Sequence, residues 1–320
     1  MTGARLALGT SPTPIERLED LGLWVKRDDK IAALYGGNKV RKLERLLGAA
    51  RAAGKTRLLT LGAAGSHQLV ATALFGRREG FDVEAVVVPQ PSSEHGRDNL
   101  RVALAGGLVP VVATSWAAAP VRLATRLRRD AYFVPLGGSN EVGSLGFVDA
   151  ANELAGQVAA GAMPEPDVVV VAMGSGGTAA GLAVGFEAAA MRTRVVGVAI
   201  SRPVPVLSVM ARRLAKRTAE RVGLTRAQAA RAAQRIDVDG RWVGRGYGWP
   251  LPEGEAATRD AAQAGLVLDA TYTAKAFACA LARAGRPGVV LYWHTLSTAP
   301  MEPLLARAPE LPLELARLFR

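Results

Sequence analysis

The sequence predicts an α/β fold with open, mostly parallel sheets and helices on both faces. Three observations point to it: short apolar runs rich in β-branched residues recur along the chain, amphipathic patterns separate them, and glycine-rich segments follow several of them. Continuously apolar strands of this kind belong to covered parallel sheets, whose ligands gather beyond the carboxyl ends of the strands. We therefore expect the glycine-rich segments to meet at one ligand site.

Seven runs are predicted to be buried strands, at residues 58–61, 83–88, 108–112, 131–134, 168–172, 195–200 and 289–292. An amphipathic helix is predicted before the first of these strands. Its apolar face contains Val40, Leu43 and Leu47, and it stops at Gly54. Another helix opens after residue 174 and runs to about residue 190. The most basic segment, residues 209–235, lacks aromatic residues and is interpreted as one or two solvated helical faces.

Composition narrows the class of protein. With 320 residues and 49% hydrophobic content, the chain can form two domains or one large one. The single cysteine, Cys279, permits neither a disulfide framework nor a cysteine metal cluster, so we expect a reducing cytoplasm and no metal site. The formal charge of +12 is spread over amphipathic helices, which does not favour nucleic-acid binding. We see no secretion signal and no run that would span a membrane.

The segment from Gly36 to Lys42 places Lys39 at the start of a helix. Asn38 is predicted to cap that helix, and the free N–H groups there favour nearby anions. Neighbouring Arg41 and Lys42 would lower the pKa of the Lys39 amine, and a partly neutral amine attacks aldehydes. A capped surface helix with ordinary lysines is the alternative reading of this segment.

A second glycine loop is made of Gly174, Ser175, Gly176, Gly177 and Thr178. It follows an apolar strand and opens a helix, so its backbone N–H groups can bind a phosphate. It lacks the lysine of a P-loop and the spacing of a dinucleotide fingerprint. An imine-forming lysine and a phosphate loop together are what pyridoxal 5′-phosphate (PLP) requires, because this cofactor carries an aldehyde and a phosphate.

The motif from Gly36 to Glu44 resembles the cofactor-lysine motif of the D-cysteine desulfhydrase and 1-aminocyclopropane-1-carboxylate (ACC) deaminase family. The similarity continues in the family's order through residues 13–18, 25–29, 59–73, 137–153, 168–181, 246–250, 266–276 and 289–295. It implies the two-domain PLP fold type II, which is like the tryptophan synthase β subunit. We then expect a large cofactor-binding domain at residues 1–50 and 137–320, a smaller inserted domain at residues 51–136, and a homodimer.

Site residues follow from this resemblance position by position. Lys39 would form the Schiff base and remove the substrate's α-proton, and Lys42 would contact the cofactor phosphate together with the glycine loop. Ser66 would bind the substrate carboxylate, although it is also suited to capping a helix. Tyr247 would lie near the substrate, with packing on the following proline as the alternative. Thr295 would contact the pyridine nitrogen.

Two departures from the family pattern affect these expectations. The chain reads Ser66-His67-Gln68 where the family usually has Ser-Asn-His or Ser-Asn-Gln, so His67 stands where an asparagine would bond the cofactor's phenolic oxygen. Imidazole can donate to that oxygen or transfer protons, and the alternative is a histidine turned away. Gln68 is expected beside the substrate with its two neighbours. Residues 296–297 read Leu-Ser instead of Gly-Gly, and His95 has no matching role and is expected on a surface helix.

The resulting prediction is a PLP-dependent lyase that acts on a small amino acid by α,β-elimination and deamination, giving a 2-oxo acid and ammonia. A neutral hydroxyl at Thr295 would favour prompt elimination over racemisation or transamination. ACC ring opening, β-replacement and racemisation remain alternatives within this chemistry. A protein that binds an amino acid or PLP without turnover is the alternative from another class.

Overall fold

The computed structural model describes residues 3–320, which divide into two compact units. The first unit contains residues 9–42 and 139–298, and the second contains residues 3–8, 43–138 and 299–320. The carboxyl-terminal residues from 299 onward thus belong to the second unit, whereas the expected boundaries gave everything after residue 137 to the large domain. Positions 1 and 2 of that expected domain lie outside the described residues.

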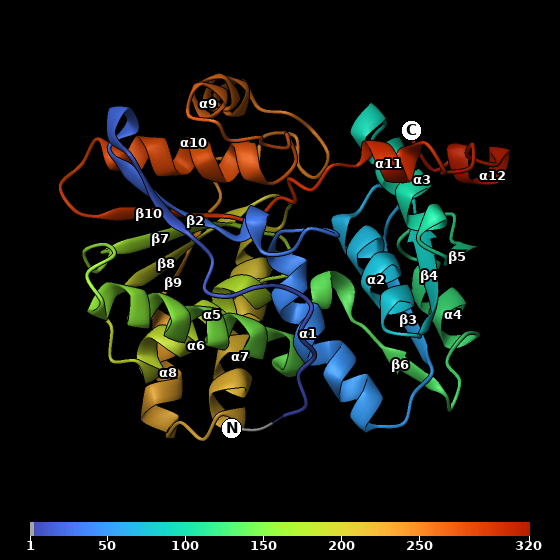
Figure 1. Cartoon of the computed structure of the whole chain (residues 1–320), viewed down its shortest axis with the longest axis horizontal. Coiled ribbons are helices and arrows are strands. Elements are labelled where there is room, and N and C mark those ends of the chain that lie inside the picture. The colour runs from blue at the N-terminus through green and yellow to red at the C-terminus, as the bar shows by residue number, and fades with distance from the viewer. Residues whose placement is uncertain (1–2) are drawn as a thin grey trace. The chain divides into compact units, whose positions relative to one another are not determined.

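The first unit is built on a six-stranded sheet with the order β1-β2-β10-β7-β8-β9 (Figure 1). Only β1 and β2 pair antiparallel, and all other neighbours are parallel. The strands are β1 (Ile15–Leu18), β2 (Leu23–Arg27), β7 (Val168–Met173), β8 (Arg194–Ala199), β9 (Ile236–Asp239) and β10 (Val290–His294). The four parallel neighbours bring the loops that follow these strands to one edge of the sheet.

Helices cover both faces of this sheet, as the sequence predicts. Val169 and Val171 of β7 pack on one face with α5 to α8, while Val170 and Ala172 pack on the other with α9 and α10, because successive side chains of a strand alternate. The helices that cover the sheet are α5 (Glu141–Ala159), α6 (Gly177–Ala188), α7 (Val204–Arg221), α8 (Arg226–Gln234), α9 (Pro252–Gln263) and α10 (Thr273–Ala284), and the unit also contains the first residues of α1 (Asn38–Ala52).

Glycines bring α5 and α6 unusually close to each other. A Cβ atom on Gly181 would lie 2.3 Å from the carbonyl oxygen of Ser144, and one on Gly185 would lie 2.4 Å from the Cβ of Ala151. Both glycines lie on one side of α6, one turn apart. The close approach of the two helix backbones therefore depends on the absence of side chains at these two positions.

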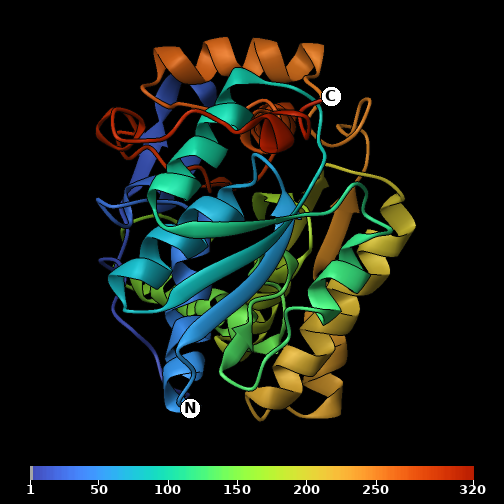
Figure 2. The ribbon, with the colours of Figure 1, turned by 90° about the vertical axis from the view of Figure 1, so that its right-hand side faces the viewer.

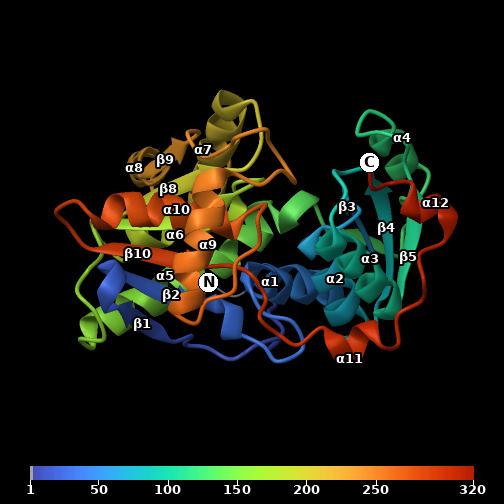
Figure 3. The same ribbon diagram turned by 90° about the horizontal axis from the view of Figure 1, so that it is seen from above.

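The second unit contains a parallel sheet with the order β5-β4-β3-β6 (Figure 2). Its strands are β3 (Arg57–Ala63), β4 (Asp82–Val88), β5 (Leu108–Val112) and β6 (Ala131–Phe133). Its helices are the rest of α1, and α2 (His67–Arg78), α3 (Glu94–Ala105), α4 (Ala119–Ala124), α11 (Glu302–Leu305) and α12 (Leu313–Ala316) (Figure 3). The last residues join this unit because Gln90 N donates to Leu318 O at 2.9 Å and Gln90 forms a bridge with Phe319.

All seven expected strands are present, and the basic segment forms α7 and α8, joined by a short turn. Three strands were not predicted: β1, β2 and β9. Each is only four or five residues long and carries charged side chains, so none shows a continuous apolar run. Within residues 3–320, no helix is both long and apolar enough to cross a membrane.

Candidate active site

Two glycines determine where the lysine-bearing helix begins. A Cβ atom on Gly36 would lie 1.9 Å from the carbonyl oxygen of Asp29, and one on Gly37 would lie 2.4 Å from that of Thr295. Gly37 also has a positive φ of 82°, which favours glycine. The amide of Asn38 then donates to Thr295 O at 3.2 Å. Only glycine fits this passage, and it places the start of α1 against the end of β10.

Lys39 lies one residue into α1, and its amine is connected to the glycine loop. Its Nζ donates to Asn38 Oδ1 at 2.8 Å, and Asn38 Nδ2 donates to Thr178 Oγ1 at 3.3 Å. The prediction that Asn38 caps the helix is therefore wrong, because its side-chain amide links Lys39 to Thr178 instead. The amine of Lys39 is thus connected to Thr178 of the glycine loop by two hydrogen bonds through Asn38.

Burial lowers the pKa of Lys39 to about 8, and the nearby negative charge of Asp269 opposes this shift. The sequence-based explanation, which attributed the lowered pKa to the charges of Arg41 and Lys42, missed burial, which is the main cause. Arg41 turns to Asp28 and Glu153, where its own charge is compensated. An amine with this pKa is substantially neutral in mildly basic solution and can act as a nucleophile or a base.

Lys42, one turn after Lys39, is buried and lies at the glycine loop. Its Nζ donates to Ser139 Oγ at 3.2 Å, and Ser139 Oγ accepts from Gly177 N at 3.2 Å and lies 2.7 Å from Ser175 Oγ. Burial, and then the charge of Lys39, lower the pKa of Lys42 well below its ordinary value. An anion beside this ammonium would offset both effects.

The glycine at the start of α6 leaves space at this point. A Cβ atom on Gly177 would lie 2.4 Å from Ser139 Oγ and 3.1 Å from Lys42 Nζ, so any side chain there would fill the space between them. Gly176 precedes it with a φ of 84°. Lys42, Ser139, Ser175 and the N–H groups at the start of α6 therefore form a cradle that suits a phosphate group.

Tyr247 belongs to a pair of tyrosines on the same unit. Tyr272 donates its hydroxyl hydrogen to Tyr247 Oη at 3.2 Å, and the two rings meet edge to face with centroids 5.7 Å apart. Burial raises the pKa of Tyr247 to about 12, so the phenol stays protonated at neutral pH. A Cβ atom on Gly174 would lie 3.7 Å from Tyr272, which places the pair beside the glycine loop.

Two charged residues, one within α10 and one just before it, support the backbone around this tyrosine pair. Lys275 is fully buried and donates to the carbonyl oxygens of Val243 and Gly246 at 2.9 and 3.0 Å, which fixes the turn before Tyr247. Asp269 accepts from the backbone N–H groups of Tyr272 and Thr273 at 2.8 and 3.0 Å, and so orders the start of α10.

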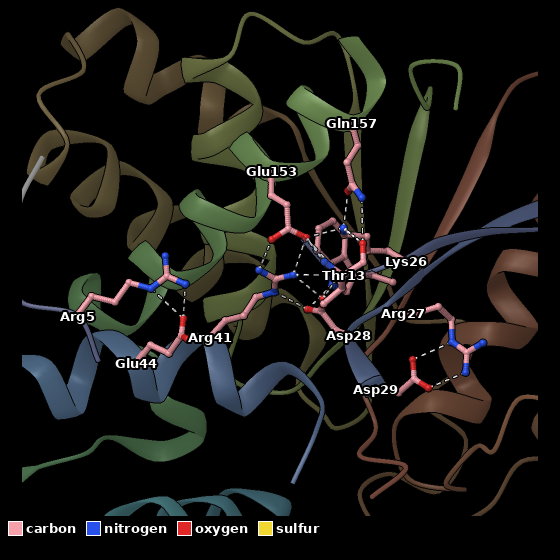
Figure 4. Close-up of polar contacts among 11 residues, drawn as sticks. Arg5, Thr13, Lys26, Arg27, Asp28, Asp29, Arg41, Glu44, Glu153 and Gln157 are labelled. Carbon is pink, nitrogen blue, oxygen red and sulfur yellow. Dashed lines mark hydrogen bonds and ion pairs between the residues drawn. The ribbon is translucent and has the colours of Figure 1, made fainter. Parts of the chain in front are cut away.

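A buried ion cluster surrounds Arg41 (Figure 4). The guanidinium of Arg41 bridges Asp28 and Glu153, with contacts of 2.7 Å to Asp28 Oδ1 and 2.9 Å to Glu153 Oε2. Lys26 Nζ contacts Glu153 Oε1 at 2.6 Å, and Trp293 Nε1 donates to Asp28 Oδ2 at 2.7 Å. Because Arg41 lies between Lys39 and Lys42 on α1 and Trp293 lies on β10, the cluster ties the lysine helix to the strand that leads to Thr295.

The end of β10 also shows how one departure from the family pattern is accommodated. Ser297 Oγ accepts from Gly36 N at 2.7 Å, so this serine supports the glycine passage rather than crowding it. His294 is buried, and burial lowers its pKa to about 4, which keeps the imidazole neutral. Its Nδ1 lies 3.2 Å from the Tyr292 hydroxyl.

Ser66, His67 and Gln68 lie in the second unit, where they start α2. Ser66 is the N-cap, because its Oγ accepts from Gln68 N at 3.2 Å. Gln68 is buried and donates to Thr72 Oγ1 at 2.9 Å within its own helix. His95 is exposed on α3, as the sequence predicts for a surface helix residue, and its Nε2 lies 3.4 Å from His67 Nε2. The roles of Ser66, His67 and Gln68 toward a substrate stay predictions.

Within the first unit, the structure brings Lys39, Lys42, Thr295, Tyr247 and the glycine loop to one end of the parallel sheet. Sequence reasoning missed five participants: Asn38 as a linker, Ser139, Asp269, Tyr272 and Lys275. Ser139 had a signal, because it ends a glycine-rich segment that follows a strand. Asn38, Asp269, Tyr272 and Lys275 lie in segments that resemble the family, at residues 36–44 and 266–276, but the residue types alone did not indicate these contacts.

Known proteins with a related sequence or structure were found in three comparisons. A family model described as "Pyridoxal-phosphate dependent enzyme" matches residues 6–295. A D-cysteine desulfhydrase of Klebsiella pneumoniae (strain 342) is 36% identical over 319 residues, covering 91% of this chain and 93% of that protein. A nocardicin C-9′ epimerase of Nocardia uniformis subsp. tsuyamanensis is 36% identical over 309 residues, covering 92% and 93%. A crystal structure of an ACC deaminase homologue superposes with a TM-score of 0.76 at 29% identity, covering 95% and 96%.

Proposed function

Because the chain belongs to the family of pyridoxal-phosphate dependent enzymes, with their fold type II, we propose that it is a lyase that removes a β-substituent and the amino group from a small amino acid. The products would be a 2-oxo acid, ammonia and the leaving group, as the name of the D-cysteine desulfhydrase relative suggests. The observation that carries the proposal is the linked set of Lys39, Asn38, Thr178, Ser139 and Lys42.

The residues of the first unit fit this cofactor. Lys39 offers the amine for covalent attachment, and the cradle of Lys42, Ser139, Ser175 and the start of α6 would hold the phosphate. Thr295 would face the pyridine nitrogen with an uncharged hydroxyl. When bound, the cofactor supplies an electron sink that stabilises negative charge at the substrate's α-carbon.

The chain's own residues would move the protons. Lys39, whose amine has a pKa of about 8, would accept the proton from the substrate's α-carbon. Burial raises the pKa of Tyr247 to about 12, so its hydroxyl is protonated at neutral pH and would donate a hydrogen bond or a proton to the departing β-substituent. The unsaturated amine that is released takes up water and yields the 2-oxo acid and ammonia.

Recognition of the substrate carboxylate is proposed for Ser66 with its neighbours His67 and Gln68. Support comes from the family resemblance and from the N–H groups at the start of α2, which favour an anion. We further propose a homodimer in the cytoplasm, which light scattering and cell fractionation would test.

The test uses the purified full chain with added PLP, wild type and Lys39→Ala, with Lys216→Ala as a matched control on the exposed face of α7. Wild type and the control should develop the absorbance band of the bound cofactor and release pyruvate, ammonia and sulfide from one enantiomer of cysteine. Lys39→Ala should do neither. Colour without turnover on a panel of D- and L-amino acids and ACC would instead support a binding protein.

Epimerisation is a second candidate, favoured by the equal identity to the nocardicin C-9′ epimerase. An epimerase returns a proton to the opposite face of the α-carbon, whereas an eliminating enzyme need not. Incubation of the amino-acid panel in D₂O separates the two: deuterium at the α-carbon of inverted substrate, with no 2-oxo acid, would replace elimination by epimerisation.

A further inference from the structure

Lys275 is a buried basic residue that the proposed chemistry does not use. It is the third residue of α10, and its side chain is fully buried. Burial lowers the pKa of Lys275, and the negative charge of Asp269 opposes that shift. The positive end of the helix dipole also disfavours an ammonium in the first turn of α10. The contacts of Lys275 must therefore offset two unfavourable effects.

These contacts are two backbone carbonyl groups in the segment between β9 and α9. The Nζ atom of Lys275 donates to Val243 O at 2.9 Å and to Gly246 O at 3.0 Å. This segment, residues 240–251, contains neither helix nor strand. Its backbone turns at residues 240–243, 243–246 and 246–249, and each turn is closed by a hydrogen bond from an N–H group to the carbonyl oxygen three residues earlier. Val243 and Gly246 are the residues that successive turns share, so one ammonium contacts both junctions.

Tyr247 follows directly after the second of these junctions. The glycines on either side of it, Gly246 and Gly248, have positive φ angles of 111° and 79°, which only glycine adopts readily. Glycine has no side chain that could hold this backbone in place by packing. The start of α10 supplies the support instead, because Tyr272 bonds the hydroxyl of Tyr247 and Lys275, three residues later, bonds the turns before it.

We infer that Lys275 acts as an internal cation, which closes the turns before Tyr247 by binding their carbonyl groups and thereby positions this tyrosine. Backbone carbonyl oxygens can bind an ammonium group, and the covalent link to α10 keeps that group at the turns without recruiting an ion from solution. Lys275 is a positioning residue, since it acts through Tyr247. Its effect on turnover rests on the proposed function, whereas the closing of the turns does not.

Trypsin reports directly on this segment, because Arg245 lies within it and is exposed. The test uses the full chain without added cofactor, as wild type, Lys275→Ala and Lys275→Met, with Lys216→Ala on α7 as the matched control. Cleavage after Arg245, measured by mass spectrometry, should be at least about tenfold faster in both Lys275 variants than in wild type and control, because hydrogen bonds from a charged donor are lost. Cleavage after the exposed Arg192, before β8, should stay within about twofold.

Chemical rescue tests whether a cation is what the turns require. Lys275→Ala leaves space for a small molecule, whereas methionine fills the place of the lysine side chain. Methylammonium has the charge and the N–H donors of the lysine head group, so it should slow cleavage after Arg245 in Lys275→Ala and have no effect on Lys275→Met. Tetramethylammonium at the same ionic strength lacks N–H groups, and formamide lacks the charge, so neither should restore protection.

Three results would overturn the inference: unchanged cleavage after Arg245 in both variants, an equal acceleration after Arg192, or protection of Lys275→Ala that methylammonium does not restore or that formamide restores equally well. None of these measurements involves cofactor or substrate, so they stand even if the proposed reaction is wrong. With bound cofactor and a substrate that the wild type converts, Lys275→Met should lower kcat about tenfold and leave KM within about twofold, because Tyr247 would act on the departing group. An unchanged kcat would remove the positioning role toward Tyr247.

Discussion

Replacing Glu153 by glutamine tests how strongly the buried ion cluster stabilises the first unit. The substitution keeps the shape of the side chain and removes its charge. Glu153 accepts from Arg41 at 2.9 Å, from Lys26 at 2.6 Å and from Thr13 N at 2.8 Å. Burial alone would raise the pKa of Glu153, but the hydrogen bonds and charges of Arg41 and Lys26 overcome this and lower it to about 2.

The expected magnitude follows from that shift. A decrease from the ordinary value of 4.5 to about 2 corresponds to about 3 kcal/mol of folding free energy at neutral pH. Because the folded-state pKa lies below the unfolded one, this contribution is complete above about pH 5 and is lost as the pH falls toward about 2. Glutamine does not titrate, so the difference between wild type and variant should shrink over the same range.

Urea unfolding at several pH values provides the assay, followed by tryptophan fluorescence. Four of the five tryptophans, Trp24, Trp242, Trp249 and Trp293, lie in the first unit, so the signal reports mainly on it. At about pH 7 Glu153→Gln should lose about 3 kcal/mol, and the exposed Glu220→Gln on α7 should stay within about 0.5 kcal/mol of the wild type. A loss below about 1 kcal/mol, or one that does not change with pH, would refute the reasoning.

Three further outcomes follow from single contacts. Gly146→Ala would place a Cβ atom 2.0 Å from the carbonyl oxygen of Arg41, so the free energy of unfolding in urea should fall by more than about 3 kcal/mol. Gly156→Ala on the same helix has open space around it and should be neutral or slightly stabilising. Cofactor-free protein should capture added PLP at a rate, followed by absorbance, that rises about tenfold per pH unit below about pH 8 and levels off above it. Burial lowers the pKa of Lys39 to about 8, and only the neutral amine attacks the aldehyde. A rate that does not depend on pH would contradict this. Lys275→Met removes the donor to two buried carbonyl groups, and the free energy of unfolding should fall by about 2 kcal/mol; a gain in stability would show that the turn before Tyr247 does not need the ammonium.

The sequence predicted the parallel strands well because their apolar runs are long and buried on both sides. The run at residues 168–172 corresponds to β7, whose side chains pack alternately on the two faces of the sheet. Short strands at the sheet edges lack this signal. In β2, the buried ammonium of Lys26 is compensated by Glu153, which is 127 residues away in the chain, so no local pattern reveals this partner.

The candidate site was predictable where the residue type itself carries the chemistry. Lys39 and the glycine loop could be identified because imine formation and phosphate binding require an amine and exposed N–H groups. Tyr272 and Lys275 could not, because their importance lies in a hydrogen bond to Tyr247 and in the carbonyls of the preceding turn. The role of Asn38 was misjudged because its partner, Thr178, is 140 residues away in the chain.

The row of glycines on one side of α6 limits how this protein can be engineered. Gly177, Gly181 and Gly185 recur every fourth residue, and the first borders the cradle while the other two set the distance to α5. A methyl group added at Gly185 would push α6 away from α5 and shift the N–H groups at its start, which form part of the cradle. Mutational libraries aimed at new substrates should therefore keep these three glycines and vary the loop that contains Tyr247 instead.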